Sequence, residues 1–154
     1  MKSFLMLIFA LLLFSSCGDS TRDTIPEGAD TSNVSWKGFQ KYCGPNNLKN
    51  FDNFKKLKGS TVTWTGKVYT VQDDPGMEES RNFEHKVIRV IMPNSESLLS
   101  DLTLRMATGL KGYSSLKKGD YVLFRGKIAY IGSKLNDHII EVTKFKKVKP
   151  KKKF

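Results

Sequence analysis

The chain has 154 residues, which is enough for one modest core but leaves no room for two. Its formal net charge is +11, yet seven of the 26 basic residues fall in the last eleven positions. The remainder carries 19 basic against 15 acidic residues. The strong charge is therefore mainly a property of the C-terminal end, and the body of the protein is only mildly cationic.

An apolar segment opens the chain. Lys2 precedes eleven consecutive apolar residues, Phe4–Phe14, and two serines then lead to Cys17. Eleven residues match the apolar region of an export signal and are too few for a membrane span, which needs about 20. The sequence therefore predicts an export signal over residues 1–16.

The residues that end at Cys17 resemble the bacterial lipobox, whose usual form is Leu, two small residues and Cys, although Phe14 stands in the first position here. The resemblance implies removal of the signal and lipidation of Cys17, with acyl chains that anchor the protein to a membrane of the cell envelope. Because no Asp follows Cys17 directly, the resemblance favours anchoring to the outer membrane if the bacterium is Gram-negative. The alternative is an ordinary signal peptide with an incidental cysteine.

The next segment is polar, and its only branched aliphatic residues are Ile25 and Val34. Such a composition cannot bury enough surface to fold alone, so we expect the lipidated cysteine and a flexible tether over residues 17–35, with an early ordered strand as the alternative.

Because lipidation accounts for Cys17, we expect no disulfide between Cys17 and Cys43. Cys43 is expected to be buried; a free thiol and an intermolecular link are the other possibilities.

The folded domain is expected over residues 36–145. An aromatic-rich stretch with a turn at 42–45 precedes a short helix at 50–58, where Phe51, Phe54 and Leu57 recur at every third position and should lie on a core. A second short helix is predicted at 108–116. Apolar alternation predicts five strands, at residues 60–71, 85–92, 102–106, 121–131 and 138–145.

The order of these elements predicts a mainly β protein, a small five-stranded OB-fold-like Greek-key barrel with one or two short helices. Gly66 and Gly126 lie inside the first and fourth strands, where a small barrel bends or bulges to turn its corners. An open β-sandwich is the competing architecture. The barrel interior should be filled by alternating residues: Val62, Trp64, Ile88, Val90, Leu102 and Leu104.

The Tyr-Cys-Gly-Pro turn at 42–45, the Leu-Lys-Gly at 57–59 and the Val-Thr-Trp-Thr-Gly at 62–66 resemble the C-terminal luminal OB domain of the wolframin family. Similar spacing continues through the stretches 101–105, 116–120, 124–126 and 132–134. The resemblance spans about residues 42–145 and implies the OB-fold and a place outside the cytoplasm. It brings no catalytic residues, and the chain lacks the family's transmembrane helices and most of its cysteines, so the luminal role is not carried over.

No pattern of catalytic residues stands out. The two histidines, His85 and His138, have no metal-ligand spacing, and the sequence contains neither a phosphate-binding glycine loop nor a nucleophile elbow. The acidic stretch 73–79 could hold a hard cation but lacks the spacing of a dedicated loop, and a solvated turn is the favoured interpretation. We therefore expect no enzyme, no cofactor and no metal.

The outer face of the first three strands should carry Lys67, Tyr69, Arg89 and Arg105, with Thr103 between them. OB-folds commonly bind oligonucleotides and oligosaccharides on this face. These four residues are therefore the predicted ligand-binding site, for an extended anionic ligand such as an oligosaccharide, a peptide or single-stranded nucleic acid, although export argues against nucleic acid. The favoured interpretation is nevertheless a solvated face, since strands must expose polar residues, on a binding or structural module whose protein or glycan partner is unknown.

The chain ends in a basic tail, residues 146–154. Proline cannot continue a strand ladder beyond Pro150, so the last residues should be free in solution. Alternatively the tail lies on an anionic lipid surface, where each Lys contributes about 1 kcal/mol.

Overall fold

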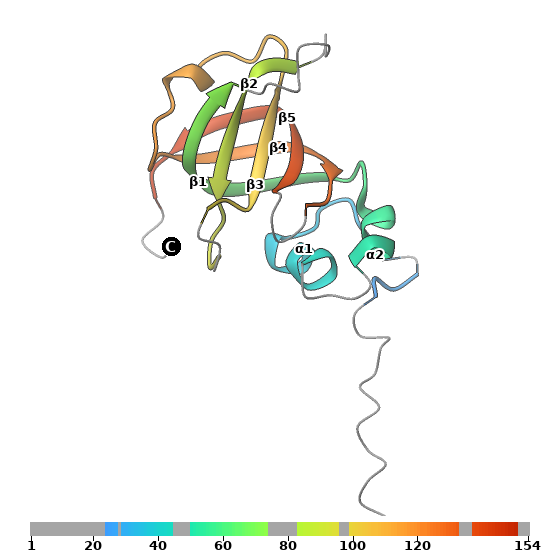
Figure 1. The fold of residues 1–154 in the computed structure, drawn as a ribbon. Helices are drawn as coiled ribbons and strands as arrows, with labels where there is room; N and C mark the ends of the chain where they lie inside the picture. Colours follow the sequence, from blue (N-terminus) through green and yellow to red (C-terminus); the bar gives the residue numbers. More distant parts are fainter. Residues whose placement is uncertain are drawn as a thin grey trace, which may run out of the picture.

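The computed structural model describes residues 24–27, 29–44, 50–73, 83–95, 99–132 and 137–150. Within them, five strands close into a barrel, and two short helices stand beside one of its ends (Figure 1). The predicted strands are all present, with ends that differ by at most three residues: β1 Thr61–Asp73, β2 Phe83–Ile91, β3 Leu102–Ala107, β4 Tyr121–Tyr130 and β5 His138–Val148. The predicted export signal, Cys17, most of the acidic loop and the last four residues lie outside the described part.

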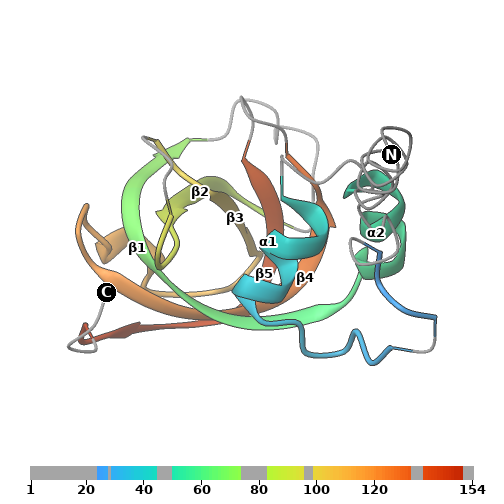
Figure 2. The ribbon, with the colours of Figure 1, turned by 90° about the horizontal axis from the view of Figure 1, so that it is seen from below.

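The order of strands around the barrel is β1-β2-β3-β5-β4, and β4 closes back onto β1. All neighbours are antiparallel except β3 and β5, which run parallel. Figure 2 looks along the resulting ring of strands. This Greek-key barrel has the plan of an OB-fold, as predicted, and its closure excludes the open sandwich.

The long first strand belongs to both sides of the barrel. Its first half, Thr61–Lys67, pairs with β4, and its second half pairs with β2. Gly66 stands at the transition and faces inward, where an added Cβ would lie 3.1 Å from side-chain atoms of Val90 and Met92. The irregularity in pairing falls three residues later, at Tyr69, where the register with β2 shifts. The glycine therefore allows close approach at the corner, and the bulge follows it.

A second irregularity shapes β5. A Cβ at Gly126 would lie 2.5 Å from the backbone oxygen of Glu141, so only glycine fits there. The register shifts at this point, and Thr143 is the extra residue on β5. Beyond it Phe145 packs against the core, and the strand continues to Val148. The predicted tail is therefore wrong in its first three residues, which are paired with β4.

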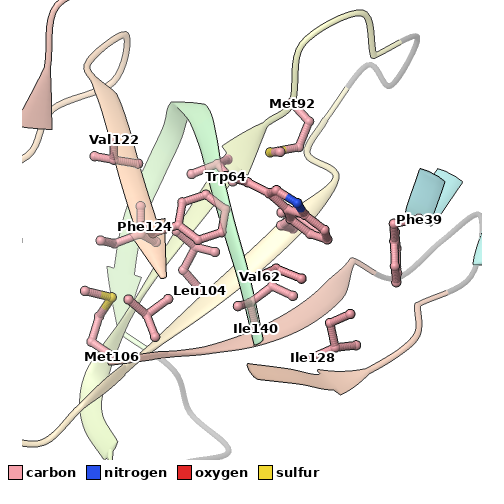
Figure 3. Close-up of a cluster of buried hydrophobic side chains, with 14 of the residues drawn as sticks. Phe39, Val62, Trp64, Met92, Leu104, Met106, Val122, Phe124, Ile128 and Ile140 are labelled. Carbon is pink, nitrogen blue, oxygen red and sulfur yellow. The ribbon is translucent and has the colours of Figure 1, made fainter. Parts of the chain in front are cut away.

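The core fills the barrel (Figure 3). Every residue predicted for the interior is buried, which confirms the inward face of the first three strands. Trp64 lies beside Phe124 of β4, with its ring nearly perpendicular to that of Phe124 at 6.4 Å. The largest fully buried side chains also come from β4, β5 and the helices: Phe39, Leu57, Phe124, Ile128 and Ile140.

The first helix, α1 (Trp36–Cys43), was not predicted. Its N-cap is Ser35, whose Oγ accepts a hydrogen bond from the amide of Gly38 at 3.1 Å. Its buried face consists of Phe39 and Cys43, one turn apart, which confirms that Cys43 is buried. Phe39 reaches the mouth of the barrel, where it lies close to Trp64 (Figure 3).

The second helix, α2 (Asn50–Leu57), agrees with the prediction, but its orientation does not. Phe54 and Leu57 are buried, whereas Phe51 is 61% exposed. Asn53 takes the inward position instead: its Oδ1 accepts from the amide of Ile25 at 2.9 Å, and its Nδ2 donates to a backbone oxygen of α1. At 100° per residue, positions 53, 54 and 57 share one face and position 51 does not.

The hydrogen bond between Asn53 and Ile25 shows that part of the predicted tether is ordered. Ile25 is 5% exposed and belongs to the core, so the chain is fastened to the domain well before residue 36.

The helix predicted at 108–116 is a single 3-10 turn, η1 (Tyr113–Ser115). In the described part of the chain, neither helix has the length and apolar character needed to cross a membrane.

Candidate functional site

Pairing between strands places three charged residues in one row on the outside of the barrel. Arg105 of β3 lies opposite Glu141 of β5, and Glu141 lies opposite Lys127 of β4. Neighbouring strands are about 4.8 Å apart, so the row alternates cation, anion and cation over roughly 10 Å.

A shallow groove of about 530 Å³ lies over this row. The turn that follows α2 supplies one wall: Gly59 adopts a φ of +84°, and its amide donates to the backbone oxygen of Ile128 at 2.8 Å. This bond holds the preceding Lys58 beside β4. The residues that give the groove its chemistry are Lys58, Arg105, Lys127, Tyr130, Ile139 and Glu141.

The lining combines three cations with one carboxylate, an aromatic ring and an aliphatic side chain. Tyr130 is 52% exposed, so its ring face is open to a ligand. Arg and Lys donate hydrogen bonds to acidic groups, and Glu141 can accept them from hydroxyls. The groove therefore suits an elongated molecule with negative charges and flat apolar faces.

Arg89, one of the four predicted residues, does not line the groove and makes another contact. Its Nε is 3.7 Å from Oδ2 of Asp137, the residue that precedes β5. The same oxygen accepts hydrogen bonds from Ser100 Oγ at 2.6 Å and from Thr103 Oγ1 at 2.9 Å. This network ties β2 and β3 to the start of β5 and balances the charge of Arg89.

The other predicted residues are dispersed. Tyr69 sits at the bulge of β1, where its ring centroid is 5.1 Å from Nζ of Lys118. Lys67 lies opposite Ile91 of β2 and Tyr121 of β4, at the corner where β1 changes partner. Of the predicted site, only Arg105 lines the groove.

Sequence reasoning missed the remaining groove residues. Lys127 and Tyr130 lie in the predicted fourth strand and Glu141 in the fifth, and in the structure Lys127 and Glu141 alternate with buried neighbours. Their meeting with Arg105 depends on the parallel pairing of β3 with β5, which no local pattern announces.

Two reactive side chains are enclosed in the core. His138 is 7% exposed, and burial lowers the pKa of its imidazole to about 4, so it is neutral and its Nδ1 accepts from the amide of Gly132 at 2.9 Å. Burial raises the pKa of the Cys43 thiol to about 12. Among the described residues, no group of three His, Cys, Asp or Glu side chains could hold a metal ion.

No family model matches the chain, and no curated protein matches it. Among solved structures, the chain is similar to one described as "OBody AM3L15 bound to hen egg-white lysozyme", with 17% sequence identity and a TM-score of 0.41. The similarity covers 64% of this chain and 85% of that one. The strand order and pairing given above make this chain a five-stranded OB-fold-like barrel.

Proposed function

We propose that this protein is a lipid-anchored, non-catalytic binding module of the bacterial cell envelope. The anchor is inferred from the apolar segment that ends at Cys17. The observation that supports binding is the groove over the row of Arg105, Glu141 and Lys127. The resemblance to the wolframin family predicts a place outside the cytoplasm and adds no ligand.

The ligand that fits the groove best is an acidic oligosaccharide. The faces of sugar rings can pack on Tyr130 and Ile139, while acidic groups meet Arg105 and hydroxyls meet Glu141. Single-stranded nucleic acid is less suitable because it stacks its bases on several aromatic side chains, and Tyr130 is the one aromatic residue that lines the groove. A peptide that adds a strand needs a free sheet edge, which a closed barrel lacks.

Binding without catalysis is proposed because Cys43 and His138 are buried in the core, and Glu141 is, among the described residues, the one carboxylate that lines the groove, whereas glycoside hydrolysis usually needs a pair. The Cys43 thiol has a strongly raised pKa and the His138 imidazole is neutral and enclosed, so neither offers a nucleophile or a base to a ligand in the groove.

The groove is tested by titrating the chain with acidic and neutral oligosaccharides in a calorimeter. Arg105→Ala and Lys127→Ala should each weaken binding of the acidic oligosaccharide roughly 10- to 100-fold, since a hydrogen bond to a charged group contributes about 1.5–3 kcal/mol. Lys86→Ala, an exposed lysine at the start of β2, is the matched control. If the chain binds no oligosaccharide, or all three variants bind like wild type, the module has a structural role instead.

The anchor is tested by growing cells with labelled fatty acid. Wild-type protein and Cys43→Ser should take up the label and enter the detergent phase, because Cys43 is buried and has no part in anchoring. Cys17→Ser should do neither. Labelling of Cys17→Ser at the wild-type level would show that the lipoprotein interpretation is wrong.

A further inference from the structure

A second positively charged surface covers the outside of β1, β4 and β5, which lie together along one side of the barrel (Figure 2). Two adjacent rows cross these three strands, one of Thr63, Arg125 and Lys144, the other of Thr65, Leu123 and Lys146. We call these six residues the basic sheet face. All of them are exposed except Thr65, which is half-buried.

The bulge in β5 creates this face. Before Thr143, the even-numbered residues of β5 point into the barrel, and an uninterrupted strand would turn Lys144 and Lys146 inward as well. The extra residue reverses the alternation, so that Phe145 enters the core and both lysines turn outward. Gly126 is what allows the bulge to fit against β4.

The charges on this face have no compensating partner in the described part of the chain. Arg125 lies directly opposite Lys144, and like charges in that relation destabilise a sheet. Within the described residues, the ion pairs involve neither of them, nor Lys146. The adjacent Lys147 behaves differently, since its Nζ is 2.7 Å from Oδ2 of Asp120. Among the described residues, the fold thus gives an ion pair to one lysine of β5, Lys147, and none to Lys144 or Lys146.

We propose that the basic sheet face docks onto an anionic phospholipid surface. The cations stand in two rows on one sheet rather than around a cleft, so a plane of phosphate groups can meet all of them at once. Thr63 can donate a hydrogen bond to phosphate oxygens, and Leu123, 38% exposed at the centre, can enter the headgroup region.

The proposed lipid anchor would act together with this face, because two attachments of one chain to the same membrane reinforce each other by effective concentration. This step rests on the proposed anchor, whereas the charge of the face does not.

The test uses the chain from Gly18 to Phe154, which has no lipid but contains the whole core, from Ile25 to Val142. Sedimentation measures binding to vesicles of phosphatidylcholine alone and of phosphatidylcholine with phosphatidylglycerol. We expect binding to the anionic vesicles only, weakening as salt rises. The triple variant Arg125→Gln, Lys144→Gln, Lys146→Gln should bind on the order of 100-fold more weakly, because each basic residue at such a surface contributes roughly five-fold.

The control is a second triple variant with the same loss of charge elsewhere, Lys37→Gln, Lys86→Gln, Lys111→Gln, which should bind within about two-fold of wild type since these residues lie off the basic sheet face. The first triple variant should melt no lower than wild type, because it removes the repulsion between Arg125 and Lys144. Leu123→Ser, which keeps the charge, should weaken vesicle binding several-fold and serves as an independent variant.

Equal losses in the two triple variants would overturn the proposal in favour of diffuse attraction by net charge. Absence of binding to anionic vesicles would overturn it as well, as would an anionic polysaccharide that binds through the same three residues as tightly as the vesicles do. None of these three residues lines the groove, so failure here is distinct from failure of oligosaccharide binding.

Discussion

The indole Nε1 of Trp64 donates a hydrogen bond of 2.8 Å to the backbone oxygen of Val34. This bond joins the first strand of the barrel to the residue just before the N-cap of α1. The same indole ring contacts Trp36 and Phe39 of that helix, at 5.5 Å between centroids in each case. A single side chain of β1 therefore fills part of the core and holds α1 over the mouth of the barrel.

Trp64→Ala should cost about 3–5 kcal/mol of the free energy of unfolding, because it leaves a large cavity. Trp64→Phe should cost less, about 1–3 kcal/mol, because it keeps a ring but leaves the oxygen of Val34 without its donor. Urea denaturation followed by circular dichroism measures both. Wild-type unfolding midpoints in the two variants would contradict the placement of this residue.

The two strand glycines should differ in their tolerance of a methyl group. In Gly126→Ala, the new Cβ would meet a backbone oxygen at 2.5 Å, which cannot move without breaking the pairing of β4 and β5. In Gly66→Ala, it would meet side-chain atoms of Val90 and Met92 at 3.1 Å, which can shift by a few tenths of an ångström. We expect a loss of at least about 3 kcal/mol for Gly126→Ala and about 1 kcal/mol for Gly66→Ala.

Thermal melting of both variants checks this order. Gly66→Val, with a branched side chain at the same corner, should fall between them. If Gly66→Ala is the more damaging of the two alanine variants, then the tighter contact is at the corner of β1 and not at the bulge of β5.

Much of the barrel could be predicted because the strands alternate cleanly, as Val62 and Trp64 do with the threonines between them. The helix α1 could not be found in this way, because it buries only Phe39 and Cys43 and includes Gly38, a poor helix former. Ser35, with Phe39 and Cys43 spaced one turn apart, was the available signal. The prediction ended β5 at residue 145, because a run of lysines favours a solvated segment. In the structure the bulge at Thr143 turns Lys144 and Lys146 outward, so the strand can continue.

The groove was less accessible to prediction than the fold. Alternation identified Arg105 as outward, but whether an outward residue belongs to a site depends on its neighbours in other strands. Arg89 has the same pattern, and its partner Asp137 comes from a connection 48 positions away. Local patterns contain no information about such pairs.

The stability of the protein should fall between about pH 6.5 and pH 4 because of His138. Burial lowers the pKa of its imidazole in the folded chain to about 4, whereas the unfolded chain takes up the proton near pH 6.5. The unfolded state therefore binds more protons in this window, and acid favours unfolding. A shift of this size corresponds to about 3 kcal/mol, fully present above pH 7 and lost on approaching pH 4.

Urea denaturation at pH 7.5 and at pH 4.5 measures this effect, and His138→Gln is the control. Glutamine does not titrate, and its side-chain oxygen can still accept from the amide of Gly132. Burial raises the pKa of Asp101, which acts in the opposite direction, so the informative quantity is the difference between wild type and variant. The same loss of stability in both proteins would exclude His138 as the source.

The Cys43 thiol should be inert until the protein unfolds. It is 1% exposed, and its raised pKa of about 12 leaves almost no thiolate, which is the reactive form, at neutral pH. In the chain from Gly18 onward it is the single cysteine, so the uptake of a thiol reagent reports on this residue alone. We expect labelling to be negligible in buffer and to rise with urea in parallel with the loss of circular dichroism.

Cys43→Ala should abolish labelling and cost about 1 kcal/mol of the free energy of unfolding, and Cys43→Ser should cost more because it buries a hydroxyl. Rapid labelling in buffer would mean that α1 opens readily from the barrel, and a disulfide-linked dimer on a non-reducing gel would favour the intermolecular link over a buried thiol.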